Sequence, residues 1–185
     1  MLKFFYQLPI SYVIAGTILV LVSWSIAIYK YSYRNCYNSA KTNRNWLLFR
    51  SLFLIFSIFV VLTATVLTRN TNEVTKLVLQ PLYSFAVAKI QPEMYRSMLM
   101  NVILFIPLGM SIVSLLSTKC NVAIRILVTS LLGVLLSTLI ESAQYFFGLG
   151  EAWTDDVICN ALGALCGSLT ICIWKILLLR KHDYT

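Results

Sequence analysis

Charged residues are scarce in this sequence. Only 12% of its 185 residues are Asp, Glu, Lys or Arg, whereas a soluble domain carries about 25%. Histidine is scarcer still, because His182 in the polar tail is the only one. A single histidine argues against a histidine-based catalyst and against a multi-histidine metal site. We therefore predict neither a metal nor a cofactor.

Two further patterns are missing. None of the five cysteines forms a CxxC pair or stands at metal-ligand spacing from His182, so we expect buried small apolar residues or reduced thiols. The stacking aromatics and basic stripes typical of nucleic-acid binding are also absent. The formal net charge of +8 is therefore interpreted as a membrane topology signal, and no nucleic-acid partner is expected.

Hydrophobic residues are what the chain has in abundance, at 59%. One small core cannot hide this much apolar side chain, so the lipid bilayer is the expected solvent. Five stretches are long enough, or nearly so, to cross it: residues 7–29, 51–68, 97–118, 126–150 and 157–174, the last with a possible extension to 179. We predict an all-α, polytopic membrane bundle of about five transmembrane helices, forming a single domain over residues 1–185.

Two segments leave room for a second interpretation. Residues 7–29 can be taken as a signal peptide, but their length and the basic residues after them favour an uncleaved helix. Residues 77–88 are too short for a span and contain Pro81. We expect an interfacial or re-entrant segment there, with a sixth span as the alternative.

Basic residues lie mainly on one side of the predicted spans. The connections after the first and third spans and the C-terminal tail are strongly basic, while acids and bases balance on the other side. Cytoplasmic loops are the basic ones in membrane proteins. The predicted topology therefore has the N-terminus outside and the C-terminus inside.

Polar residues interrupt the apolar spans or stand at their ends, and five of them form the candidate ligand-binding site: Asn101, Glu141, Gln144, Asp156 and Asn160. Residues three or four apart share a helix face, which pairs Glu141 with Gln144 and Asp156 with Asn160. The predicted topology puts all five in the outer half of the bilayer, and short connections make neighbouring helices antiparallel. We predict that they converge on a polar pocket open to the exterior.

Each of these residues also has a purely structural interpretation. A charge at membrane depth costs about 2.5–3.5 kcal/mol, so Glu141 is either functional or paired. Its structural alternative is an interhelical hydrogen bond to Asn101 or Asn160. Asp156 can cap the helix that it begins, a role that Thr154 or Asp155 can also fill.

Three other residues are expected to shape the bundle. Pro107 lies in the middle of the third span and should kink it. Gly163 and Gly167 form a small face on the last span that lets another helix approach closely. An aromatic belt at the outer interface is predicted for four residues: Tyr145, Phe146, Phe147 and Trp153.

Residues 95–167 resemble the VanZ-like family of bacterial membrane proteins. The resemblance rests on three motifs in order: Asn101 followed by an apolar run to Pro107-Leu-Gly109, Glu141-x-x-Gln144, and Asp156-x-x-x-Asn160 before a Gly-rich helix. Many members carry an Arg or a further acid before the last Asp, whereas residues 148–154 hold only Glu151. The resemblance implies a multi-pass protein of the bacterial plasma membrane, with a role in glycopeptide (teicoplanin) resistance or in the cell envelope.

Three functions remain open at the level of the sequence. The first is a non-enzymatic membrane factor that binds a lipid-like, lipid-linked or glycopeptide ligand through the polar pocket. The second is a membrane enzyme in which Glu141 is a general acid or base and oxygen ligands hold a divalent cation. No nucleophile motif supports an enzyme, so no catalytic residue is assigned. The third is a small ion- or proton-coupled transporter, which at five spans would need to form a homo-oligomer.

Overall fold

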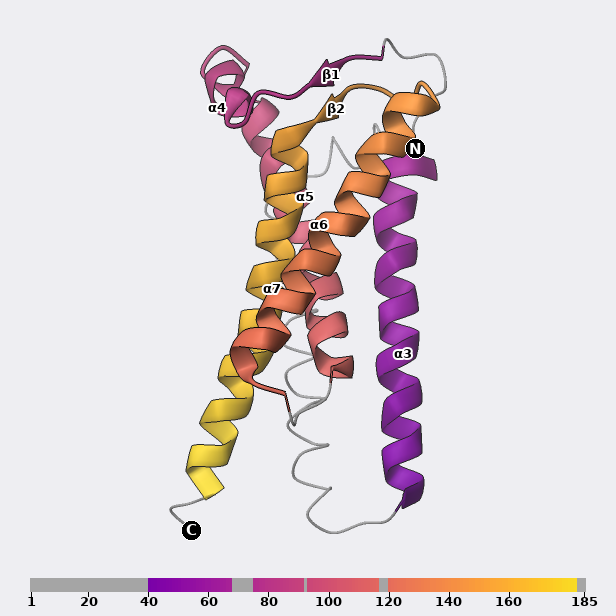
Figure 1. Ribbon diagram of the computed structural model, residues 1–185, viewed down its shortest axis with the longest axis vertical. Coiled ribbons are helices and arrows are strands. Elements are labelled where there is room, and N and C mark those ends of the chain that lie inside the picture. The colour runs from indigo at the N-terminus through magenta and orange to yellow at the C-terminus, as the bar shows by residue number, and fades with distance from the viewer. Residues whose placement is uncertain (1–39, 68–74, 92, 117–119, 183–185) are drawn as a thin grey trace.

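The computed structural model describes residues 40–67, 75–91, 93–116 and 120–182, and they are mostly helical (Figure 1). The long helices are α3 (Ala40–Leu62), α5 (Glu93–Leu115), α6 (Val122–Phe146) and α7 (Thr154–His182). Helix α3 continues into a π-helical turn, η1 (Thr63–Leu67). Four helices in this part of the chain are long and apolar enough to cross a membrane. The prediction of an all-α membrane bundle is confirmed, while the predicted first span, residues 7–29, lies outside the described residues.

Short elements gather at the upper end of the bundle in Figure 1. They are β1 (Leu77–Val78), α4 (Tyr83–Ala88) and β2 (Ala152–Trp153), and the two strands pair in parallel with Leu77 opposite Ala152. The stretch 77–88 therefore contains a two-residue strand and a six-residue helix. Neither element is long enough to form a sixth span.

Helix α6 ends earlier than its apolar run suggests. The predicted span reaches residue 150, but the helix ends at Phe146. Gly148 and Gly150 both have positive φ angles, 64° and 125°, in a region that glycine adopts without the steric cost of a side chain. Gly148 thus stops the helix in the left-handed conformation common at helix ends, and the chain turns into β2.

The closest packing in the bundle is between α5 and α7. A Cβ atom on Gly163 would overlap the carbonyl oxygen of Val102, and one on Gly167 would overlap that of Ile106. Gly109 is placed in the same way against the backbone of Ala164. Both helices advance by four residues between the first two contacts, so they run in the same direction. The predicted small-residue face of the last span is thus covered by the backbone of α5.

Helix α6, which lies between α5 and α7 in the sequence, packs beside α7 and runs antiparallel to it. Gly133 packs against Ala164, and Ser137 is hydrogen-bonded to Asn160. Moving four residues forward on α6 therefore means moving four residues back on α7. One further step along this register places Glu141 level with Asp156.

Helix α3 has the least buried surface of the four spans and stands to one side of the others in Figure 1. Its main contact is with α5, through a core of Val61, Phe105, Leu108 and, from α6, Ile140. One polar contact also joins the two helices, between the hydroxyls of Ser57 and Ser111 at 3.2 Å.

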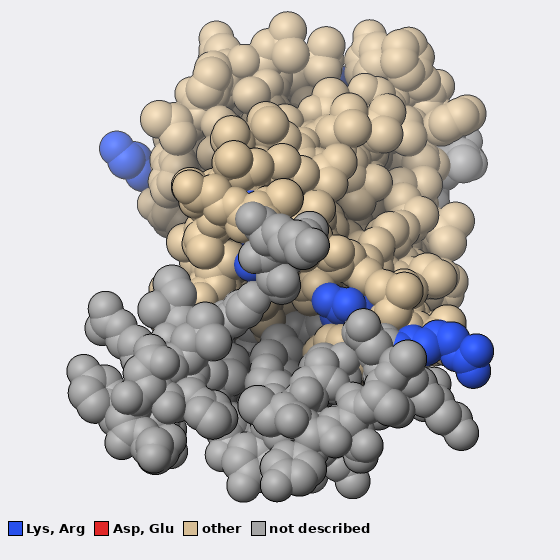
Figure 2. Space-filling view, turned by 60° about the horizontal axis from the view of Figure 1, so that its bottom comes forward, with Lys and Arg blue, Asp and Glu red and all other residues tan. Residues whose placement is uncertain are grey.

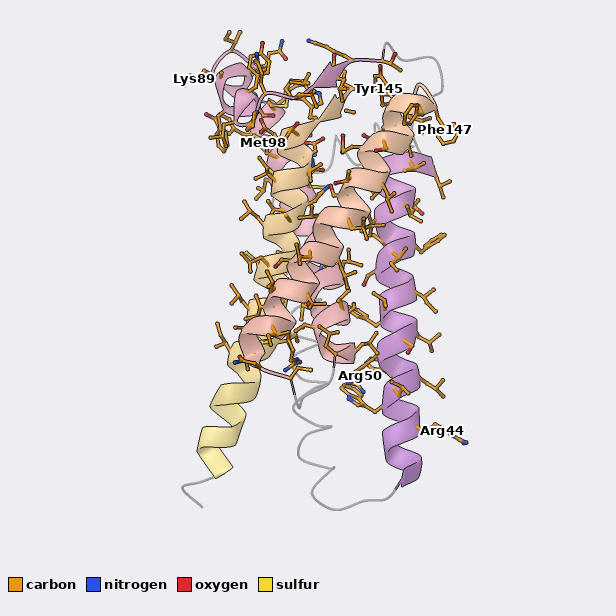
Figure 3. All side chains as sticks on the ribbon, viewed as in Figure 1. Arg44, Arg50, Lys89, Met98, Tyr145 and Phe147 are labelled. Atoms are coloured by element: carbon orange, nitrogen blue, oxygen red, sulfur yellow. The ribbon has the colours of Figure 1, made fainter. Side chains whose placement is uncertain are left out.

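Two arginines close the lower end of α5. The Arg125 guanidinium, which is buried, donates to the carbonyl oxygen of Val113 at 2.7 Å, and that of Arg50 donates to the carbonyl of Ser114. These carbonyls have no partner within the helix, and cations are favourable at this end of a helix dipole. Figure 3 shows Arg50 at this end, with Arg44 farther along α3, and Figure 2 shows Lys and Arg but no Asp or Glu among the described residues on this face.

We expect Gly167→Val to lower the thermal midpoint of the purified protein by several degrees. The added side chain must displace the backbone of α5 at Ile106, and overpacking of this kind costs about 1–3 kcal/mol. Cys166→Val is the matched control, because its neighbouring side chain is exposed. Circular dichroism during heating measures both variants, and equal midpoints would contradict the close packing.

Candidate functional site

Glu141 is a buried carboxylate near the upper end of α6. Its side chain is only 8% exposed, and Oε2 accepts the backbone N–H of Trp153 at 2.9 Å. Trp153 belongs to β2, whose position is fixed from the other side because the Ala152 N–H donates to the carbonyl oxygen of Lys76. The carboxylate therefore lies where α6, β2 and the start of α7 meet.

Asn160 lies one turn deeper, between α7 and α6. Its Nδ2 donates to the hydroxyl of Ser137 at 2.8 Å, and Ser137 is four residues before Glu141 on the same face of α6. The side chain is 2% exposed, yet its Oδ1 has no hydrogen-bond partner. A buried amide oxygen in that state costs about 1–3 kcal/mol, so it is not explained by stability.

Gln144 is the third buried member, and it reaches a different helix. Its Nε2 donates to the carbonyl oxygen of Thr65 in η1 at 2.9 Å. The side chain is 1% exposed, and Oε1 has no partner. Gln144 thus shares a helix face with Glu141, as predicted, but its amide joins α6 to the end of the α3 segment.

Asn101 and Asp156 are placed by the packing of their helices. Gly163 contacts Val102, so in the parallel register Asn160 is level with Leu99, less than one turn from Asn101. Asn101 shares a face with Phe105 and Leu108, which pack toward α3 and α6. Asp156 shares a face with Asn160 and lies at the level of Glu141, half-buried. All five predicted residues therefore occupy the same end of the bundle.

The polar groups of this end have a common electrostatic character. One N–H of the Asn160 amide and one of the Gln144 amide donate to protein acceptors, while both amide oxygens are buried without a partner. Among the residues whose burial is described, Arg125 is the one fully buried cation, and it lies at the opposite end. We name the group Asn101, Glu141, Gln144, Asp156 and Asn160 the polar cluster.

Asp155 makes long-range contacts that the sequence did not predict. Its carboxylate accepts the backbone N–H of Leu82 at 2.5 Å and that of Ser84 at 2.7 Å. The sequence offered Asp155 only as an alternative cap for the helix that contains it, and the structure shows that its carboxylate holds the start of α4. Leu82 has φ 63°, a conformation that costs a branched side chain energy. No pattern in the sequence connects residues 82 and 155.

The aromatic residues at this end divide into two groups. Trp153 stacks on Tyr83 at 6.0 Å between ring centroids, and its indole N–H donates to Glu151 at 3.0 Å. It therefore joins β2 to α4. Tyr145 and Phe147 are exposed at the upper end of α6 (Figure 3).

Within the described ranges, no three His, Cys, Asp or Glu side chains come together in an arrangement that would hold a metal ion. The polar cluster is built from two carboxylates and three amides on three helices. Its chemistry is that of hydrogen-bond acceptance inside an apolar bundle, where each unpartnered oxygen favours a donor.

Comparison with known families identifies the family of this chain. A family model described as VanZ/LLP1 matches residues 10–176, which is most of the chain, and the protein therefore belongs to that family. Searches of curated proteins and of solved structures gave no match. The three motifs of the polar cluster all lie within the matched residues.

Asp155→Ala should release the start of α4. Each lost bond is a charge-assisted one, worth about 1.5–3 kcal/mol, so hydrogen exchange at the Leu82 and Ser84 amides should accelerate by roughly tenfold or more. Glu93→Ala is the control, since Glu93 is an exposed acid at the start of α5. Unchanged exchange at both amides in Asp155→Ala would show that this carboxylate does not hold α4.

Gln144→Met tests whether the buried amide serves stability. The change keeps the volume, removes one hydrogen bond worth about 0.5–1.5 kcal/mol and also removes an unpartnered oxygen that costs about 1–3 kcal/mol. We expect a thermal midpoint equal to or above that of the wild type. A drop of several degrees would mean that Gln144 is retained as a structural tie between α6 and η1.

Proposed function

We propose, taking membership of the VanZ/LLP1 family as the premise, that this membrane protein binds an amphipathic ligand at the outer face of the bacterial plasma membrane. The ligand is lipid-like, lipid-linked or a glycopeptide, and its polar part binds to the polar cluster. The family resemblance points to teicoplanin resistance or another envelope function as the outcome of that binding. The proposed role is non-enzymatic.

One observation carries the proposal. Glu141 and two amides are buried among apolar helices, and two of the amide oxygens have no partner. A charged residue inside a membrane protein is costly and is usually a functional site. The remaining hydrogen-bonding capacity of Gln144 and Asn160 has no use within the described protein, which supports a role toward a ligand.

The proposed orientation rests on charge. Arg44, Arg50 and Arg125 lie toward the end of the bundle opposite the polar cluster, and basic residues concentrate on the cytoplasmic side of membrane proteins. The end with β1, α4 and β2 then faces outward. Exposed Tyr145 and Phe147 fit a place at the outer interface, where aromatic rings contact both lipid and water.

Cells that depend on this protein for survival in teicoplanin should lose protection when the polar cluster is altered. We expect Glu141→Ala and Asp156→Ala to lower the inhibitory concentration to that of cells without the protein. Thr138→Val is the control, because Thr138 is exposed on α6 and its hydroxyl bonds within its own helix. Membrane fractions are blotted for each variant so that equal amounts are compared.

A second pair of variants separates lost function from lost folding. Asn160→Leu and Gln144→Met remove neutral polar groups with little change in volume, and both should also abolish protection. Full protection in well-expressed Glu141→Ala and Asp156→Ala cells would contradict the proposal and leave the polar cluster with a structural role only.

A further inference from the structure

We propose that the protein has a second binding site, at the end of the bundle opposite the polar cluster, which binds an anionic phosphate group. The guanidinium of Arg125 is the hydrogen-bond donor of this site, and Arg50 beside it adds positive charge. The site uses none of the residues of the polar cluster. The inference therefore goes beyond the proposed function and does not depend on it.

Arg125 is a buried cation without a counter-charge among its hydrogen-bond partners. Its side chain is 4% exposed, Nη2 donates to the carbonyl oxygen of Val113 at 2.7 Å, and the Nε–H has no partner. A guanidinium has five N–H groups, of which the remaining three are on Nη1 and Nη2, and it keeps its charge in proteins. Buried charges are normally paired with an opposite charge, and the carbonyl of Val113 supplies only a dipole.

The helices around Arg125 contain no acid that could neutralise it. Residues 94–140 have no Asp or Glu, and neither does α3. Five acids of the described chain lie at the upper end of the bundle in Figure 1: Glu93, Glu141, Glu151, Asp155 and Asp156. The other two, Glu73 and Asp183, lie outside the described residues. Among the described residues, a counter-charge for Arg125 is therefore lacking at this end.

Arg50 brings a second positive charge to the same turn of α5. Its guanidinium donates to the carbonyl of Ser114, the residue after Val113, and lies over the ring of Trp46 at 5.7 Å from the centroid. A helix C-terminus carries roughly half a negative charge, whereas two guanidiniums carry two positive ones, which leaves an excess of about one and a half positive charges. That excess favours an anion beside the end of α5.

The phosphates of a bilayer lie at the level of this site. Helix α5 has 23 residues, which extend roughly 35 Å at about 1.5 Å per residue, while the hydrocarbon core is about 30 Å thick. The end of α5 therefore reaches the headgroups. Guanidiniums match the geometry of phosphate, and basic pockets between membrane helices bind anionic headgroups. An anionic phospholipid is thus the source of phosphate that the position of the site favours.

The test uses the full-length protein in detergent and native mass spectrometry of bound lipid. Phosphatidylglycerol and phosphatidylcholine with identical acyl chains are compared, because both carry a phosphate and only the first has a net negative charge. We expect phosphatidylglycerol to bind at least about tenfold more tightly, the change that one charge-assisted hydrogen bond produces. Arg125→Gln should bring this ratio toward one, and Arg50→Gln should lower it.

Arg44→Gln is the matched control. It removes one positive charge from the same end of the protein, at an exposed residue farther along α3, and should keep the ratio. Arg125→Lys keeps the charge without the planar fork, so we expect the ratio to fall only part of the way. This variant decides the result if Arg125→Gln does not fold, which circular dichroism of each variant detects.

Competition with inorganic phosphate identifies the source of the anion. A preference for phosphatidylglycerol that persists in excess inorganic phosphate supports a phospholipid ligand, and one that is lost supports a site for free phosphate. Equal binding of the two lipids to the wild type overturns the anion site. A preference that survives unchanged in the Arg125 and Arg50 variants, or that Arg44→Gln lowers as much as they do, overturns its assignment to these residues.

Discussion

The backbones of α5 and α7 touch because glycine stands at each point of contact. Gly163 and Gly167 on one helix, and Gly109 on the other, leave no side chain between the two main chains. In lipid, where apolar side chains gain little by leaving the solvent, such close van der Waals packing is what holds helices together. The resulting register is specific, and it sets Asn101 near the level of Asn160. The position of every residue in the polar cluster follows from this contact and from the return of α6 beside it.

Much of this arrangement is encoded locally and could be predicted. Apolar length marks the four described spans, and helical spacing puts Glu141 and Gln144 on one face. The small-residue face at Gly163 and Gly167 was also recognisable. The helix that packs against this face could not be predicted, because small residues indicate that some helix approaches closely but do not indicate which one. Ser137, the hydrogen-bond partner of Asn160, lies four residues before Glu141, so helical spacing does put it on the same face of α6 as Glu141.

The contacts that lie outside such patterns depend on long-range geometry. Asp155 reaches α4, more than seventy residues away in sequence, and Gln144 reaches the carbonyl of Thr65. Both contacts depend on how the helices rotate and cross, which periodicity does not describe. The end of α6 at Phe146 was missed for a different reason. Apolar character continues to Leu149, and the backbone conformations of Gly148 and Gly150 end the helix there.

The same direction of α5 and α7 has a consequence for how the protein is made. Parallel helices joined by one chain need an intervening helix that crosses back, so the contact between them cannot exist until α6 has been threaded through the bilayer and α7 has emerged from the ribosome. Until then Gly109 lacks the backbone of Ala164 against which it packs in the folded protein. The central packing of the bundle is therefore one of the last events of its biosynthesis, and a nascent chain that stops before α7 lacks the partner for which α5 is shaped.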